Sequence, residues 1–122
     1  MRVLLVSVNQ TSTPAPVVPI GTCAVAEAAE RADHRVRILD FMFRSHPLRA
    51  LGTTLRSFQP QVVGVSIRNV DNADMRRPVE HWRIPRTVDM LEDYPTVIGG
   101  PAVSLFPRAL LKRTAAERAV IG

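Results

Sequence analysis

Short runs of aliphatic and β-branched residues recur along the chain, and each one breaks into polar, proline-rich or glycine-rich residues. Such runs are typical of strands that are buried on both faces of a parallel sheet. They predict strands over residues 2–8, 35–40, 62–67, 96–98 and 118–121. Between them, apolar residues recur at helical spacing or follow alanine-rich patterns, which predicts helices over residues 20–32, 48–58, about 85–93 and about 106–113.

This alternation predicts an α/β fold, because consecutive parallel strands are joined by right-handed crossover connections. The simplest arrangement is a flavodoxin-like, Rossmann-like parallel sheet of three layers, with its five strands in the order 2-1-3-4-5. The sequence stops as the fifth strand ends, so we expect the sheet to lack its final helix. We expect another domain, or a second copy in a homo-oligomer, to bury the apolar surface left on the fifth strand.

The composition limits the classes of protein to consider. With 122 residues, of which 46% are hydrophobic, the chain predicts one domain over residues 1–122. We find neither an apolar run of membrane-spanning length nor a signal-peptide pattern, so we expect a cytoplasmic protein without a membrane partner. The single cysteine, Cys23, cannot form an internal disulfide or hold an iron–sulfur cluster alone, and we expect it to be buried in a helix.

The net charge of +5 raises the question of nucleic acid. The arginines are scattered from Arg2 to Arg118, and no aromatic residues are interleaved with them to stack bases. We therefore expect no nucleic-acid partner.

Two predicted strands end in residues that suit a ligand. The third ends in S-I-R-N-V-D-N from Ser66, and the fourth ends in the Gly99-Gly100-Pro101 run. Ligands of open α/β sheets bind at the carboxyl ends of the strands. The first loop offers a hydroxyl, a guanidinium, amides and a carboxylate, and the second offers backbone without side chains. Together they predict a site for a large ligand with a polar tail.

The order of these segments supports a resemblance. V-L-L-V-S-V-N is followed by a proline-rich loop and P-I-G-x-C, then by D-H-R-V-R-I-L-D, P-Q-V-V-G-V-S-I-R-N-V-D-N, V-I-G-G-P-A-V-S-L-F-P and A-V-I-G. The chain thereby resembles, over almost its whole length, the cobalamin-binding domain of cobalamin-dependent radical S-adenosylmethionine enzymes. The resemblance implies a module that positions a corrinoid, as a methyl carrier, for a partner barrel that carries a C-x-x-x-C-x-x-C iron–sulfur motif. That motif, and with it the radical chemistry of a methyltransferase-type enzyme, is not in this sequence.

One departure from related modules concerns the cobalt. Many cobalamin modules carry D-x-H-x-x-G in the first loop, where the histidine becomes the lower cobalt ligand, but the loop from Asn9 to Gly21 holds neither histidine nor aspartate. The resemblance then implies base-off cobalamin without a histidine lower ligand from that motif, as in many radical members of the family. We expect no metal ligand from this chain.

The candidate cofactor-binding residues follow from the loops and the resemblance. Ser66 is expected to hydrogen-bond the nucleotide tail, and Gly99 and Gly100 to let the backbone lie against the dimethylbenzimidazole. Arg68, Asn69 and Asp71 suit either ligand contact or loop folding through Asx turns. The full set is Asn9, Pro16, Val18, Ser66, Arg68, Asn69, Asp71, Gly99, Gly100, Pro101 and Ser104.

Several apolar residues near these loops have two interpretations. Val17, Val18 and Ile20 would either pack on the corrin macrocycle or, as we expect, anchor their loop to the core. Phe106 would either help the fourth loop to wrap the tail or, as we expect, begin a helix and be buried.

Other users of the fold fit less well. A receiver domain needs acidic residues after the first strand, and a dinucleotide-binding domain needs G-x-G-x-x-G there; neither is present. No G-x-S-x-G indicates a hydrolase. Three prolines in the first loop remove amides that a flavin phosphate would need. A cofactor-free interaction domain remains the main alternative, and a flavin-binding domain the next.

Overall fold

The computed structural model describes residues 1–12, 14–68, 83–114 and 116–122. Its strands are β1 (Arg2–Ser7), β2 (Arg35–Asp40), β3 (Val62–Ser66), β4 (Thr96–Gly99) and β5 (Arg118–Ala119). Its helices are α1 (Ile20–Arg31), α2 (Pro47–Phe58), α3 (Arg83–Asp89), α4 (Pro101–Leu105) and α5 (Pro107–Arg113). The predicted alternation of strands and helices is confirmed.

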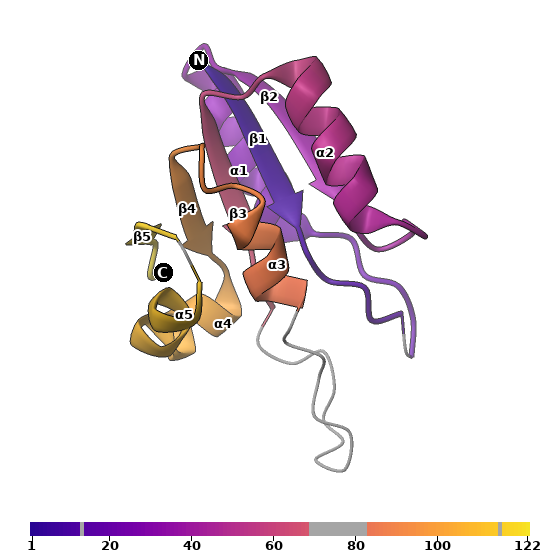
Figure 1. The fold of residues 1–122 in the computed structure, drawn as a ribbon, viewed down its shortest axis with the longest axis vertical. Coiled ribbons are helices and arrows are strands. Elements are labelled where there is room, and N and C mark those ends of the chain that lie inside the picture. The colour runs from indigo at the N-terminus through magenta and orange to yellow at the C-terminus, as the bar shows by residue number, and fades with distance from the viewer. Residues whose placement is uncertain (13, 69–82, 115) are drawn as a thin grey trace.

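The five strands form one parallel sheet in the order β2-β1-β3-β4-β5, as predicted. Figure 1 shows the carboxyl ends of β1, β3 and β4 pointing toward the same end of the molecule. The strands are in register there, with Ser7 of β1 beside Ser66 of β3 and Ser66 beside Gly99 of β4. These strand ends therefore form one continuous edge.

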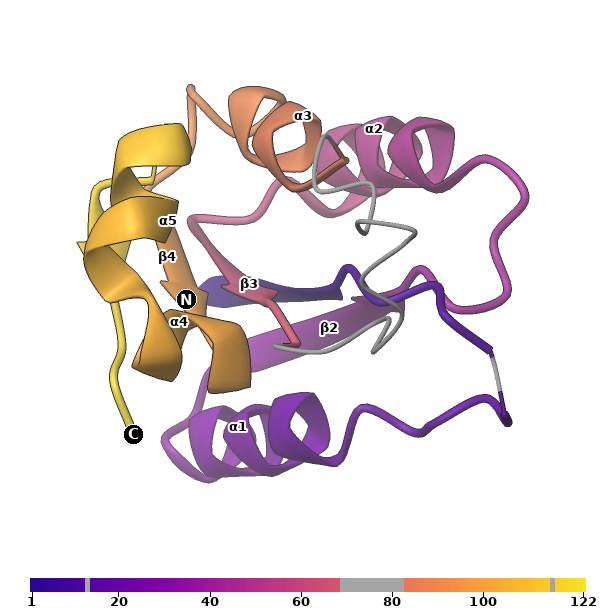
Figure 2. The same ribbon diagram turned by 90° about the horizontal axis from the view of Figure 1, so that it is seen from below.

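Helices lie on both faces of the sheet. α1 covers one face, and α2 and α3 lie together on the other (Figure 2). α4 and α5 close the end of the sheet formed by β4 and β5, where they contact those strands. This is the predicted three-layer arrangement.

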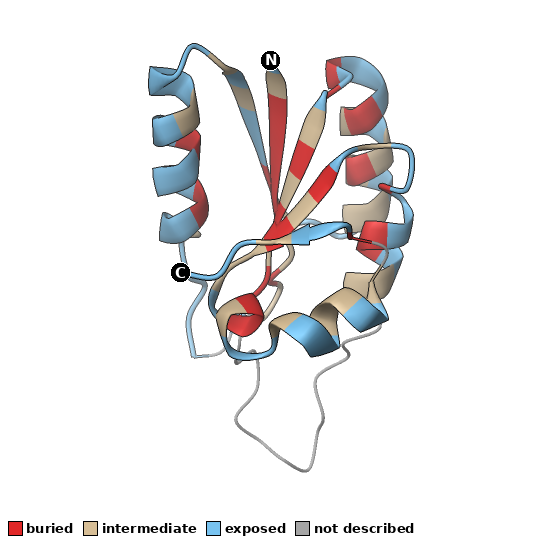
Figure 3. Cartoon of the chain, turned by 90° about the vertical axis from the view of Figure 1, so that its left-hand side faces the viewer, coloured by how far each residue is buried: buried red, intermediate tan, exposed pale blue. Residues whose placement is uncertain are grey.

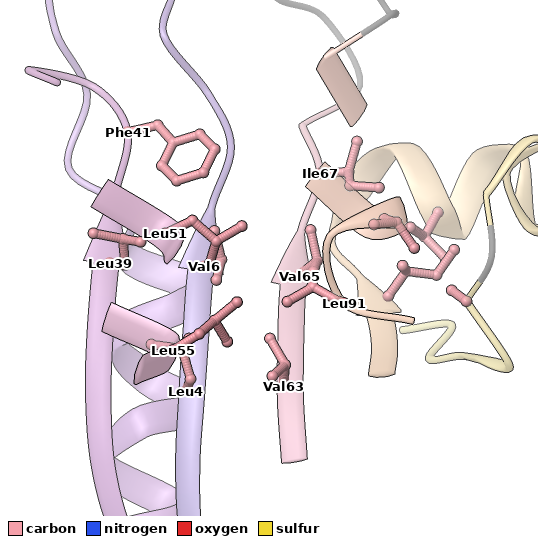
Figure 4. Close-up of a cluster of buried hydrophobic side chains, with 14 of the residues drawn as sticks. Leu4, Val6, Leu39, Phe41, Leu51, Leu55, Val63, Val65, Ile67 and Leu91 are labelled. Carbon is pink, nitrogen blue, oxygen red and sulfur yellow. The ribbon is translucent and has the colours of Figure 1, made fainter. Parts of the chain in front are cut away.

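The larger hydrophobic core lies between the sheet and α2 and α3. Figure 4 shows Leu4 and Val6 of β1 beside Leu51 and Leu55 of α2, and Val65 of β3 on the side of Ile67 and Leu91 in the same cluster. The helical spacing that predicted a shared face on α2 is confirmed, because Leu51, Leu55 and Phe58 are all buried. The guanidinium of Arg37 on the edge strand β2 lies 4.6 Å from the centre of the Phe58 ring, a cation–π contact that covers this end of the core.

The core on the α1 face is much smaller. It consists of Val3, Leu5 and Ala26, with Val36 and Val62 packed against them. Within the described residues, no helix follows β5 to cover this face beside α1. Figure 3 shows the buried positions of α1 restricted to the side that faces the sheet.

Several predicted boundaries were wrong. The helix expected over about 106–113 is α5, but α4 was not expected, because residues 101–105 were assigned to the loop after the fourth strand; the two short helices meet at Phe106. Pro107 explains the break, because a proline disfavours helical backbone at the residue before it, and Phe106 has φ −132° and ψ 50°. α3 begins and ends earlier than expected, and β5 has two residues instead of four.

Three burial expectations were also wrong. Cys23 is exposed because α1 buries the face of Thr22 and Ala26, four residues apart, and Cys23 lies off that face. Phe106 is 60% exposed, because it lies at the junction of two helices and not at the start of a packed one. The third concerns the first loop: Val17, Val18 and Ile20 do not anchor it to the core, since they are 46%, 67% and 73% exposed.

Candidate functional site

A cavity of about 550 Å³ opens between α1 and the carboxyl half of the sheet. Its lining comes from the strand ends, from the loop before α1, from the first turns of α1 and from the start of α4. The lining residues are Leu5, Ser7, Asn9, Val17, Val18, Pro19, Ile20, Gly21, Thr22, Val25, Gly64, Val65, Ser66, Arg68, Val97, Ile98, Gly99, Gly100, Pro101, Val120 and Gly122. The cavity lies on the sheet face that has the smaller core.

The sheet forms the floor of the cavity, and glycines in two neighbouring strands leave parts of this floor without side chains. In the sheet, Gly64 of β3 lies between Leu5 and Val97, and Gly99 lies beside Ser66. A Cβ at Gly64 would come within 2.8 Å of Leu5 Cδ2, so a side chain there would displace the neighbouring leucine, while Gly64 itself is half-buried and lines the cavity. The glycines leave backbone exposed in the floor, which suits a flat group lying against it.

Gly99 and Gly100 have different roles. A Cβ at Gly99 would only approach Val120 Cβ, at 3.9 Å, so the fold itself tolerates a side chain there. Gly100 has φ +101°, and a Cβ would lie 2.7 Å from the carbonyl oxygen of Ile67. Around it, the Ile67 amide donates to Gly99 O, and the Ala102 amide donates to Ile67 O. Gly100 is thus required by the turn into α4 itself.

The wall opposite the floor is apolar and partly exposed. Val17, Val18, Ile20 and Val25 line it, and each keeps about half or more of its side chain exposed to solvent. Exposed valines and isoleucines gathered at one cavity are an apolar surface that a ligand can cover.

Polar groups are few and come from different elements. Ser7 and Asn9 follow each other closely at the end of β1, Ser66 ends β3, and Thr22 belongs to the first turn of α1. Arg68 is the one charged side chain among the described lining residues. Asn9 has a structural task, since its Oδ1 accepts a hydrogen bond of 3.1 Å from the Thr11 amide in an Asx turn. An apolar cavity with a few polar groups is the usual form of a small-molecule site.

The structure brings most of the predicted site residues together. Those that line the cavity are Asn9, Val18, Ser66, Arg68, Gly99, Gly100 and Pro101. Pro16 is exposed and outside the lining. Ser104 is outside it too: its hydroxyl hydrogen-bonds the backbone of Gly122, at 2.9 Å to the carbonyl oxygen and 3.2 Å to the amide. Asn69 and Asp71 lie outside the described residues.

Sequence reasoning missed several lining residues. Ser7 and Gly64 are on the same sheet face as Ser66, and the two-residue period of β1 and β3 would have identified them. Thr22 and Val25 belong to α1, whose inward face has few large apolar residues. Its alanine-rich sequence therefore did not indicate which face of the helix turns toward the sheet.

Metal ligands are a separate question. Neither His34 nor His46 lines the cavity: His34 lies 3.3 Å from the N-terminal amine, and His46 precedes α2. In the described parts of the chain, no three His, Cys, Asp or Glu side chains are grouped to hold a metal ion. Nor is any described helix long and apolar enough to cross a membrane.

Comparison with known proteins gives a family and a structural neighbour. The family model of the B12 binding domain matches residues 6–122. The chain belongs to the B12-binding domain family.

A solved structure, of the radical S-adenosylmethionine methyltransferase TsrM from Kitasatospora setae with tryptophan substrate and a SAM analogue bound, is similar to this B12-binding domain with a TM-score of 0.84. The two sequences are 32% identical over 98% of this chain, which spans 22% of the TsrM chain. None of the curated proteins matches.

Proposed function

We propose that this B12-binding domain holds cobalamin by its nucleotide tail, with the dimethylbenzimidazole in the cavity between α1 and the sheet. The observation that carries the proposal is the shape of that cavity. Its floor exposes backbone at Gly64 and Gly99, and its walls are aliphatic, which fits a flat, largely apolar ring system. The match of the family model supports the same ligand.

Different residues of the cavity would contact different parts of cobalamin. Gly64 and Gly99 would contact the base, and Ser66 would hydrogen-bond its nitrogen or the attached ribose. Val17, Val18 and Ile20, exposed at the mouth of the cavity, would pack against the corrin macrocycle. A base held in the cavity cannot ligate cobalt, so we propose that cobalamin binds base-off. We also propose that it has no histidine lower ligand from this chain, and none of the described lining residues is a histidine.

We further propose that the domain works with a radical S-adenosylmethionine domain, in the same polypeptide or as a separate chain. The likeness to TsrM, a radical S-adenosylmethionine methyltransferase, supports this partner. Bound cobalamin supplies a cobalt centre that carries a methyl group. The residues of this chain bind and orient the cofactor and shield its tail from water, while the iron–sulfur chemistry belongs to the partner.

The test is cofactor retention with a blocked cavity. The purified protein is incubated with hydroxocobalamin or methylcobalamin and desalted, and its visible spectrum is recorded. Val25→Trp fills the cavity from α1, and the matched control Ala24→Trp places the same ring on the neighbouring exposed residue, outside the lining.

We expect the wild-type protein and Ala24→Trp to retain base-off cobalamin in near-stoichiometric amounts, and Val25→Trp to lose it. Equal cobalamin retention in the two variants would mean that the nucleotide tail binds outside this cavity. Absence of retention in the wild type would favour a cofactor-free interaction domain.

A further inference from the structure

Thr22 is a buried polar residue that the fold does not use. It lines the cavity, it is 4% exposed, and its hydroxyl has no hydrogen-bond partner among the residues that the structure describes. A threonine inside a helix commonly donates to the carbonyl oxygen four residues earlier. For Thr22 that oxygen belongs to Val18, and it accepts a 2.8 Å hydrogen bond from the Ile20 amide instead.

The amides around Thr22 are also unpaired. α1 begins after Pro19, which provides no side-chain cap, and no acidic residue stands in the first turn. The Cys23 amide donates to Pro19 O at 3.0 Å, but the Gly21 and Thr22 amides find no acceptor in the described chain. Two N–H groups and one O–H group without acceptors among the described residues therefore lie together at the N-terminus of the twelve-residue helix α1, the positive end of its dipole, beside the cavity.

We propose that these three donors bind the phosphodiester of the cobalamin nucleotide tail, with the Thr22 hydroxyl as the group that selects for it. The inference rests on the proposed function and adds to it a subsite for the charged part of the tail. A helix N-terminus favours an anion because both its dipole and its free amides point there. Arg68, which also lines the cavity, adds a positive charge.

The proposal explains why the fold keeps an unpaired hydroxyl. A buried hydroxyl without a partner destabilises the apo protein, and a valine of the same shape would remove that cost. Thr22→Val should therefore raise the melting temperature of the apo protein while it weakens ligand binding. A threonine with a purely structural role would give the opposite change in melting temperature.

The experiment compares two truncated corrinoids, cobinamide and cobinamide phosphate, which differ by the phosphate. Their affinities are measured by titration on the wild type, Thr22→Val and Thr22→Ser, and the apo proteins are melted. Thr54→Val, on α2 and outside the cavity lining, is the matched control. We expect Thr22→Val to weaken cobinamide phosphate by about ten-fold and cobinamide by less than about two-fold.

Thr22→Ser and Thr54→Val should remain within about two-fold of the wild type for both ligands. Equal weakening of both ligands by Thr22→Val, or no weakening of either, would overturn the phosphate subsite while cobalamin retention still supports the proposed function. A lower melting temperature of apo Thr22→Val would also overturn it. A wild type that binds none of the corrinoids would overturn both proposals.

Discussion

Two adjacent glycines at the end of β4 differ in what constrains them. Gly100 has φ +101° and ψ 176°, a backbone conformation that is essentially limited to glycine, and its hydrogen atoms face the backbone of Ile67. Gly99 has ordinary strand geometry, and a Cβ there would make only an ordinary van der Waals contact, at 3.9 Å from Val120 Cβ. One glycine is therefore required by the fold, while the other is available to the ligand.

This difference predicts opposite effects of alanine. Gly100→Ala should lower the free energy of unfolding by at least about 2 kcal/mol, since it adds backbone strain to a contact of 2.7 Å. Gly99→Ala should change it by less than about 1 kcal/mol. Urea unfolding followed by circular dichroism measures both. Equal destabilisation by the two variants would contradict the assignment.

Gly99→Leu extends the comparison to binding. A leucine there has room in the folded protein but occupies part of the cavity floor, so the apo protein should stay folded and lose cobalamin. Equilibrium dialysis against hydroxocobalamin measures the loss, which we expect to exceed about ten-fold. Undiminished binding would remove Gly99 from the proposed site.

At this scale the sequence identified the residues that lie in loops or in glycine runs. Ser66, Arg68 and Gly99 stand where strand patterns break, and they do line the cavity. Thr22 and Ser7 lie inside elements, where a single polar residue looks like any other, and only the packing of α1 on the sheet shows that both are buried.

Among the elements, α1 and α2 cover opposite faces but contribute differently to stability. α2 buries three large side chains, Leu51, Leu55 and Phe58, in the larger core. α1, with the same length, buries only Thr22 and Ala26. The sheet is therefore held mainly from the α2 side, and the α1 side is left for the ligand.

Matched truncations on the two helices should show this difference. Leu51→Ala removes a fully buried side chain and should cost about 2–5 kcal/mol. Val25→Ala, at a side chain that is 55% exposed, should cost less than about 0.5 kcal/mol in the apo protein. Chemical unfolding of both variants measures the costs; a Val25→Ala cost near that of Leu51→Ala would contradict the division of roles.

The elements with long apolar periods were predicted best. α2 and the first four strands follow their patterns closely, because burial against a large core imposes the period. α5 was predicted, but α4 was missed, because the Gly99-Gly100-Pro101 run is typical of a loop and a helix of five residues has no apolar period to reveal it. β5 is short because only Val97 and Ile98 of β4 offer it partners.

For the whole molecule, strand order and strand direction followed from alternation and the handedness of crossovers. The sequence predicted the position of the cavity only in part. It placed the site at the carboxyl ends of the strands, but it did not indicate on which face of the sheet the cavity lies. The cavity lies on the α1 face because α1 covers that face only in part, and this depends on packing between elements that are distant in sequence. The molecule thus has a well-packed half and an open half.

Thermal unfolding with and without ligand tests the central claim, that the open half of this B12-binding domain is completed by the nucleotide tail of cobalamin. A ligand at about 100 times its Kd stabilises a protein by about 2.7 kcal/mol, which raises Tm by several degrees. We predict this rise with cobalamin and a clearly smaller rise with an equal concentration of cobinamide, which lacks the base. Equal rises with both ligands, or no rise with cobalamin, would contradict the account.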